Sequence, residues 1–167
     1  DTRREKKLLA HLGINAPRVL AHHAHNEAQS TPSLLKFLTE GQNIALVTDA
    51  GMPSVSDPGY HLTKAAHEAG FKVQVIPGVS AVPSALAVSG LPAEDFRFIG
   101  FLPRKQGAQE ALLTELKNQT STFVLFESPR RICTTLEALI GAWGDRAACL
   151  CRELTKTHEE VLPAPLT

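Results

Sequence analysis

Residues 44–59 read IALVTDAGMPSVSDPG, which is four consecutive apolar residues followed by a loop rich in glycine, proline and serine. A short apolar run between turn residues is typical of a strand buried on both faces of a parallel sheet. Open parallel sheets bind ligands beyond the carboxyl ends of their strands. We therefore expect an α/β protein whose ligand-binding edge is built around the loop 49–59.

Strands and helices are expected to alternate along the rest of the chain. The expected strands are 18–22, 44–47, 73–76, 96–101, 123–126, 148–151 and 159–162, and the expected helices are 2–12, 31–40, 58–69, 80–89, 108–118 and 130–143. Such alternation indicates βαβ units and a mostly parallel sheet. The linker-like stretch 90–95 divides the chain, and we predict one α/β domain over residues 1–92 and a second over residues 93–167.

Two of the expected helices begin with capping signals. Thr31 followed by Pro32 predicts an N-cap with proline at the first helical position. Asp57 followed by Pro58 has the same pattern, and we favour a cap for Asp57. Asp49 and Asp57 could also serve as acid–base groups or hold ribose hydroxyls, and for Asp49 this role and a purely structural one both stay open.

Three loops follow strong strand candidates: 49–59, 77–81 and 127–131. The first two combine glycine, which lets a ligand approach the backbone closely, with proline, which stiffens the loop. The second also leads into a helix N-terminus, whose free N–H groups suit a carboxylate or a phosphate. No G-x-G-x-x-G follows a strand and no G-x-x-x-x-G-K-[ST] occurs, which disfavours dinucleotide-binding and P-loop proteins.

The composition narrows the class of protein further. Seventeen basic and seventeen acidic residues cancel, so the overall charge predicts neither a nucleic-acid nor a membrane partner. Three cysteines without a CxxC spacing disfavour a disulfide framework and a zinc ribbon, and fit a reducing, cytoplasmic compartment. No apolar run approaches the ~20 residues that span a bilayer. The abrupt, Met-less start and the abrupt end suggest an internal fragment of a longer protein.

Two polar features allow more than one interpretation. The cluster HHAHNE at residues 22–27 consists largely of residue types that can bind metals. Neighbouring residues on a strand point to opposite faces, however, so a polar loop is favoured over a metal site. Four basic pairs are typical of solvated helix faces, and they would form a phosphate-binding rim if several converged. These pairs are Arg3-Arg4, Lys6-Lys7, Arg104-Lys105 and Arg130-Arg131.

The segments LVTDAGMP at 46–53 and SDPGY at 56–60 closely resemble the signature loop of the tetrapyrrole methylase superfamily. The chain is most similar to the branch that methylates a cytidine 2′-hydroxyl in 16S ribosomal RNA with S-adenosylmethionine. Further segments agree in order and spacing: DTR at 1–3, HNE at 25–27, IPG at 76–78 with SA at 80–81, SGLP at 89–92, GFLP at 100–103, FESPRR at 126–131 and RELTK at 152–156.

This resemblance implies two tetrapyrrole-methylase-like α/β domains with largely parallel sheets, both incomplete here, and a homodimer. It implies that the family's first strand and part of the C-terminal domain are missing from this chain. S-adenosylmethionine would bind between the domains. The implied cofactor-binding residues are Asp49, Ala50, Gly51, Met52, Pro53, Pro77, Gly78, Val79, Ser80 and Ala81, with Phe126, Glu127, Ser128 and Pro129 from the second domain. Met52 stands where relatives often carry threonine.

Methyl transfer from a sulfonium to an oxygen is an in-line displacement, so the protein must mainly align the donor and exclude water. A base near the ribose hydroxyl would help, because the hydroxyl is a poor nucleophile until it loses its proton. The catalytic candidates are Asp49, Arg3 and Glu153, with Asp1 as a further carboxylate. Arg3, Arg131 and Lys156 could hold RNA phosphates or serve as structural ion-pair partners. The implied mechanism uses no metal.

Two alternatives stay open beside the RNA methyltransferase. One is another enzyme of the same superfamily, acting on a corrin precursor or on a modified protein side chain. The other is a module that binds S-adenosylmethionine without catalysis. The run of branch-specific segments favours the RNA enzyme, and turnover with small-subunit RNA would distinguish all three.

Overall fold

The computed structural model describes residues 2–15 and 18–166. Contacts within the chain define two compact units, Asp1–Ser80 and Ala81–Thr167, which are described separately below. Helices and strands are mixed, and one pair of strands is parallel, as the sequence predicts. The domain boundary predicted after residue 92 stays a prediction, because these units are defined by contacts alone.

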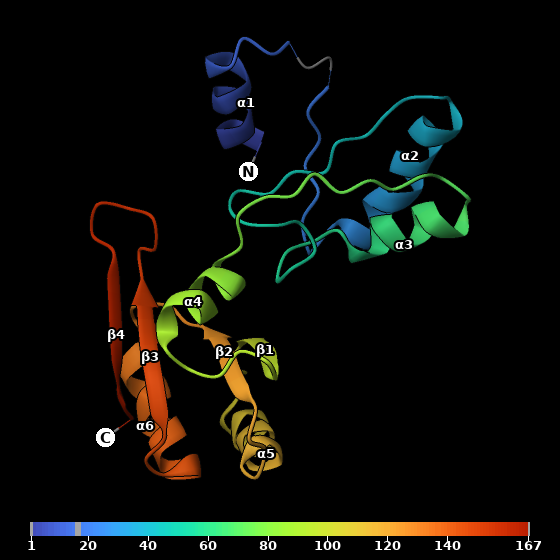
Figure 1. The fold of residues 1–167 in the computed structure, drawn as a ribbon. Coiled ribbons are helices and arrows are strands. Elements are labelled where there is room, and N and C mark those ends of the chain that lie inside the picture. Colours follow the sequence, from blue (N-terminus) through green and yellow to red (C-terminus); the bar gives the residue numbers. More distant parts are fainter. Residues whose placement is uncertain (1, 16–17, 167) are drawn as a thin grey trace. The chain divides into compact units, whose positions relative to one another are not determined.

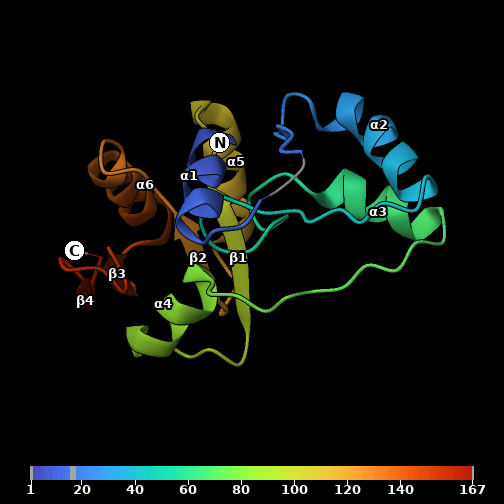
Figure 2. The same ribbon diagram turned by 90° about the horizontal axis from the view of Figure 1, so that it is seen from above.

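The described residues of the first unit form three helices joined by long irregular segments. They are α1 (Thr2–His11), α2 (Glu27–Thr39) and α3 (Tyr60–Glu68). Helices α2 and α3 lie side by side in both views (Figures 1 and 2). The buried apolar residues of this pair are Leu34 on α2 and Leu62 and Ala66 on α3. The helix predicted at 2–12 is confirmed, and the one predicted at 58–69 begins at Tyr60.

The strands predicted at 18–22, 44–47 and 73–76 are wrong. In the part of the first unit that the structure describes, these segments run as irregular chain. Their apolar side chains are largely exposed, with Val47 at 55%, Val75 at 70% and Ile76 at 84%. An apolar run shows which residues can be buried, but a strand also needs a hydrogen-bonded neighbour.

The N-cap predicted at Thr31 is also wrong, because α2 begins one turn earlier. The backbone N–H groups of Asn26 and Glu27 both donate to the carbonyl of His23 at 2.9 Å, so a turn already leads into the helix there. Thr31 is buried, and its hydroxyl donates to the carbonyl of Glu27 at 2.7 Å. Pro32 consequently lies inside the helix.

Over residues 81–166, the second unit forms two pairs of strands and three helices. In chain order these elements are α4 (Ala81–Ser89), β1 (Phe96–Phe101), α5 (Gln106–Leu116), β2 (Thr122–Phe126), α6 (Ile132–Trp143), β3 (Ala147–Arg152) and β4 (Glu160–Pro165) (Figure 1). Strands β1 and β2 are parallel and are joined through α5, which makes a βαβ unit. Helix α4 contacts both β3 and β4.

The expectation of largely parallel sheets needs a correction in this unit. Strands β3 and β4 pair antiparallel, with Ala147 opposite Pro165 and Arg152 opposite Glu160. The connection 153–159 explains the direction, since a parallel return requires a crossover of about a dozen or more residues. The described sheets are therefore one parallel pair and one antiparallel hairpin.

The core of the second unit lies between the βαβ unit and α6. Leu102, Leu113 and Leu139 form its buried centre, and Leu116 is fully buried as well. The indole N–H of Trp143 donates to the carbonyl of Leu113 at 2.9 Å. This carbonyl belongs to the last turn of α5, where helix carbonyls lack partners within their own helix. Trp143 thus ties the end of α6 to the end of α5.

Replacing Trp143 with phenylalanine should lower the free energy of unfolding by about 1–2 kcal/mol, because the carbonyl of the buried Leu113 loses its donor. Urea unfolding followed by far-ultraviolet circular dichroism measures the change. Phe101, an aromatic residue that is 56% exposed on β1, offers a control as Phe101→Leu. Equal midpoints for the two variants would contradict the role given to the indole N–H.

Within the described residues, no helix combines the length and the apolar character that crossing a membrane would need.

Candidate functional site

The loop 49–59 of the first unit folds back on itself. The hydroxyl of Thr48 donates to the Asp57 carboxylate at 2.6 Å, which joins the two ends of the loop. The backbone N–H of Ser54 donates to the carbonyl of Pro58 at 3.3 Å. The prediction that Asp57 caps the next helix is therefore wrong, because its carboxylate closes the loop instead.

A carboxylate from another helix binds the start of α3. Gly59 is the N-cap residue of α3, with φ 144°. Glu27, the first residue of α2, accepts hydrogen bonds at Oε1 from the backbone N–H of Gly59 at 2.8 Å and of His61 at 3.0 Å. Free N–H groups at a helix N-terminus favour a negative charge. No sequence pattern predicts this role, although Glu27 belongs to the HNE segment at 25–27.

The surroundings of Glu27 are polar and closed to solvent. A hydrogen bond of 2.8 Å joins His22 Nδ1 and the Ser30 hydroxyl. The other ring nitrogen of His22, Nε2, lies 3.7 Å from Glu27 Oε1. Burial works to raise the pKa of Glu27, but the backbone hydrogen bonds from Gly59 and His61, with the electrostatic effect of the nearby His61 and His22, lower it below its usual range. The described residues contain no cluster of three or more potential metal ligands, and His22 belongs to this network.

The two loops predicted to bind the cofactor approach each other in the first unit. A Cβ added to Gly51, which has φ 74°, would lie 4.0 Å from the carbonyl oxygen of Val79. A Cβ added to Gly78 would lie 3.3 Å from Met52 Sδ. The structure thus brings residues 49–53 together with residues 77–80. Gly51, Gly78 and Val79 are exposed, so these backbones are open to a ligand at their point of approach.

Glu127 has a structural environment at the end of β2. Its Oε1 accepts from the backbone N–H of Ser128 at 2.7 Å, and its Oε2 accepts from the Thr135 hydroxyl at 2.7 Å. Arg131 lies 3.5 Å from Oε2. Burial works to raise the pKa of Glu127, but the Thr135 and Ser128 hydrogen bonds and the Arg131 charge lower it. The side chain therefore joins the β2–α6 connection to α6.

The lowered pKa of Glu127 predicts a loss of stability in acid. Folding favours the ionised carboxylate, so its contribution is complete above the ordinary value of 4.5 and disappears as the pH falls through the lower folded value. The melting temperature of Glu127→Gln should therefore depend less on pH than that of the wild type between about pH 5 and pH 3. Calorimetry across this range tests it, and parallel curves for the two proteins would contradict the prediction.

The other predicted site residues are distributed over both units. Asp49 is exposed at the start of the loop 49–59, and Arg3 is exposed on α1. Ala81 begins α4. Glu153 is exposed after β3, has φ 51°, and pairs with Lys156 at 3.0 Å. Asp1 lies outside the described residues.

Two of the predicted RNA-binding side chains have partners within the chain. Lys156 forms the ion pair with Glu153, and Arg131 donates from NH2 to the carbonyl of Leu102 at 3.3 Å in addition to its pairing with Glu127. The interpretation of Arg131 and Lys156 as structural ion-pair partners is therefore the one that these contacts favour.

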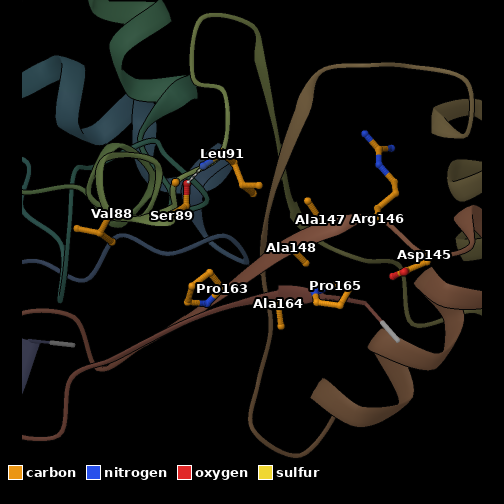
Figure 3. A pocket seen from close by; sticks show the side chains of 11 residues that line it. Val88, Ser89, Leu91, Asp145, Arg146, Ala147, Ala148, Pro163, Ala164 and Pro165 are labelled. Atoms are coloured by element: carbon orange, nitrogen blue, oxygen red, sulfur yellow. Dashed lines mark hydrogen bonds between the residues drawn. The ribbon is translucent and has the colours of Figure 1, made fainter.

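The second unit also contains an open groove of about 550 Å³ between the end of α4 and the β3–β4 hairpin. Residues 88–91, 145–148 and 163–165 line it, and in Figure 3 the Leu91 N–H donates to the Ser89 hydroxyl at its edge, at 3.1 Å. Among the described residues that line this groove, none belongs to the predicted site. We therefore assign the candidate site to the paired loops of the first unit.

The sequence of residues 1–167 matches the family described as Tetrapyrrole (Corrin/Porphyrin) Methylases. The chain belongs to this family. The resemblance predicted from the signature loop is thereby confirmed, and the paired glycine loops are parts of a methylase fold.

Curated relatives with the name ribosomal RNA small subunit methyltransferase I are similar to the chain. One from Halalkalibacterium halodurans is 46% identical over 166 residues, which are 99% of this chain and 57% of the relative. One from Vibrio cholerae is 46% identical, and one from Mycobacterium tuberculosis is 47% identical. Both matches include 99% of this chain, and they cover 58% and 59% of these relatives. The chain thus spans about three fifths of the length of the curated relatives it matches.

Proposed function

We propose that this protein transfers a methyl group from S-adenosylmethionine to small-subunit ribosomal RNA, at the 2′-hydroxyl of a cytidine ribose in 16S RNA. The observation that carries the proposal is the approach of the loop 49–53 to the loop 77–80, where Gly51 and Gly78 leave the backbones exposed. The names of the similar relatives support ribosomal RNA as the substrate. The ribose position rests on the resemblance of the signature segments.

The residues of the paired loops fit a cofactor that is bound through the backbone. Glycines at positions 51 and 78 permit a close approach, and Pro53 and Pro77 stiffen the two loops beside them. S-adenosylmethionine, when bound, supplies an electrophilic methyl group. The loops would orient it and exclude water, which are the main requirements of an in-line displacement. Ala81 and residues 126–129 would complete the contacts.

We assign the proton acceptor to Asp49. It is exposed and starts the loop that the resemblance assigns to the cofactor. A carboxylate near the ribose hydroxyl would take its proton as the methyl group is transferred. Arg3, exposed on α1, would hold an RNA phosphate. The proposal includes a homodimer that acts in the cytoplasm.

A methylation assay with the intact protein tests this function. The protein is incubated with methyl-labelled S-adenosylmethionine and either naked 16S RNA, assembled small subunits or a corrin precursor. We expect label in RNA, resistant to alkali as a 2′-O-methyl nucleotide. Label in the corrin alone would show another methylase of the family. Binding of S-adenosylmethionine without any product would show a non-catalytic module, and either outcome overturns the proposal.

Gly78→Ala should weaken the binding of S-adenosylmethionine severalfold. The new Cβ would press on Met52 at 3.3 Å from Sδ and displace one loop from the other. Because the thioether is flexible, the loss should be about three- to tenfold rather than complete. Isothermal titration calorimetry measures it.

The double variant Gly78→Ala, Met52→Ala provides the control, since it removes the sulfur that the new Cβ meets. The double variant should bind more tightly than the sum of the two single changes predicts. Additive losses would mean that the contact between Gly78 and Met52 does not set the spacing of the loops.

A further inference from the structure

Glu27 is a buried carboxylate far from the signature loop in the sequence, yet it binds the residue at which that loop ends. Its relative exposure is 8%, and it accepts two backbone N–H groups that are 32 and 34 positions away in the chain. We propose that Glu27 is a positioning residue for the cofactor loop, holding Gly59 so that the loop 49–53 is presented to S-adenosylmethionine already ordered. This inference rests on the proposed function.

Gly59 is the point through which Glu27 acts on the loop. It is buried, and its backbone passes so close to the loop that an added Cβ would collide with Ser54 Oγ and lie 2.8 Å from Leu46 Cδ2. Leu46 precedes the loop and Ser54 lies within it. One residue, fixed by one carboxylate, therefore contacts both the entry and the middle of the loop.

Backbone contacts connect Gly59 and its neighbours with residues 49–53, the half of the loop that is proposed to bind the cofactor. The Ser54 N–H binds the carbonyl of Pro58 at 3.3 Å, and the Val55 N–H lies 3.4 Å from the carbonyl of Met52. Met52 and its neighbour Gly51 then meet Gly78 and Val79 of the second loop. A continuous series of short contacts thus connects Glu27 with the place where the two loops approach each other.

The chemistry of this connection explains why the residue is acidic. Gly59 and His61 present N–H groups at the N-terminus of α3, where the helix dipole favours a negative charge. A single oxygen, Oε1, accepts from both of them and lies 3.7 Å from the buried Nε2 of His22. The lowered pKa of Glu27 agrees with a carboxylate that is ionised in this position.

A loop that is ordered before the ligand arrives binds more tightly than one that must be ordered by the ligand. If the competent conformation is only partly populated, the apparent dissociation constant rises by the inverse of that population. Saturating cofactor restores the competent conformation, so the rate at saturation changes little. Loss of Glu27 should therefore be seen in the affinity for S-adenosylmethionine far more than in kcat.

The experiment compares Glu27→Ala, Glu27→Gln and Glu68→Ala in the intact protein. Glu68 is a matched control, because it is an exposed carboxylate at the other end of α3 and pairs with Lys64. Calorimetric titration with S-adenosylmethionine, methylation kinetics with 16S RNA, and hydrogen exchange of the backbone N–H groups at 54–61 are measured for each protein. Glutamine keeps an acceptor oxygen but loses the charge, so it should fall between alanine and the wild type.

We expect Glu27→Ala to raise the dissociation constant of S-adenosylmethionine about tenfold or more, with kcat at saturation within about twofold of the wild type. Exchange of the Gly59 and His61 N–H groups should become faster in this variant, and Glu68→Ala should behave as the wild type. Unchanged affinity in Glu27→Ala, or an equal loss in Glu68→Ala, would overturn the inference. The proposed function would fail differently, since the wild type itself would then bind no cofactor or leave the RNA unmethylated.

Discussion

Gly59→Ala should destabilise the first unit strongly and weaken the binding of S-adenosylmethionine with it. Gly59 has φ 144°, a conformation that residues with a Cβ rarely adopt, and it is buried. The added methyl group would collide with the Ser54 hydroxyl and lie 2.8 Å from Leu46 Cδ2. Backbone strain and overpacking each amount to about 1–3 kcal/mol, so a total of about 2–6 kcal/mol is expected. Chemical denaturation and calorimetric titration measure the two effects.

Gly70→Ala is the matched control for this prediction. Gly70 also has a positive φ, 79°, but a Cβ there would meet no atom within 4 Å. Its substitution therefore introduces backbone strain without a collision, and it lies at the far end of α3 from the loop. We expect a smaller loss of stability and no change in cofactor affinity for Gly70→Ala. Equal losses in the two variants would show that crowding against Ser54 and Leu46 is unimportant.

The elements of the second unit could be predicted from the sequence, with ends that differ by up to three residues. The strand expected at 96–101 is β1, and the strands expected at 123–126 and 148–151 are each extended by one or two residues in β2 and β3. Here each strand pairs with a neighbour that is close in the chain, so local pattern and tertiary pairing agree. The prediction of largely parallel sheets fails for β3 and β4, because the connection between them is too short for a crossover.

In the first unit the same reasoning failed for the strands. The run 44–47 has the composition of a buried strand, but Val47 is 55% exposed and the segment lacks a ladder in the described part of the unit. Apolar composition indicates that a segment can be buried. It does not show whether a neighbouring strand is present to pair with that segment.

In the candidate site too, features set by neighbouring residues could be predicted, whereas contacts between residues far apart in the chain could not. The loops 49–53 and 77–80 are predicted as ligand-binding loops from their glycines and prolines, and they lie close together in the structure. That they bind the cofactor stays a prediction. The cap of α3 was assigned to Asp57 because Asp-Pro is a local capping signal. The structure instead uses Glu27, which is 32 positions away from Gly59, so no local pattern could identify it.

Leu139→Ala is the second change with a large expected effect. Leu139 lies on α6, is 6% exposed, and forms the core of the second unit with Leu102 and Leu113. Removing its branched end deletes apolar contacts and leaves a cavity, because the surrounding helices and strands relax only in part. A loss of about 2–5 kcal/mol in the free energy of unfolding is expected. That is a large share of the stability of an ordinary domain, and urea unfolding of the intact protein measures it.

Leu150→Ala separates burial from the mere loss of a leucine. Leu150 belongs to β3 of the same unit but is 39% exposed, so the same atoms are removed with much less of the buried contact. We expect a loss well under that of Leu139→Ala, of about 1 kcal/mol or less. Hydrogen exchange adds a second readout, because β1, β2 and α5 should lose protection in Leu139→Ala as one cooperative body. If Leu150→Ala were as destabilising, or if these elements kept their protection, the core would have to be placed elsewhere in the unit.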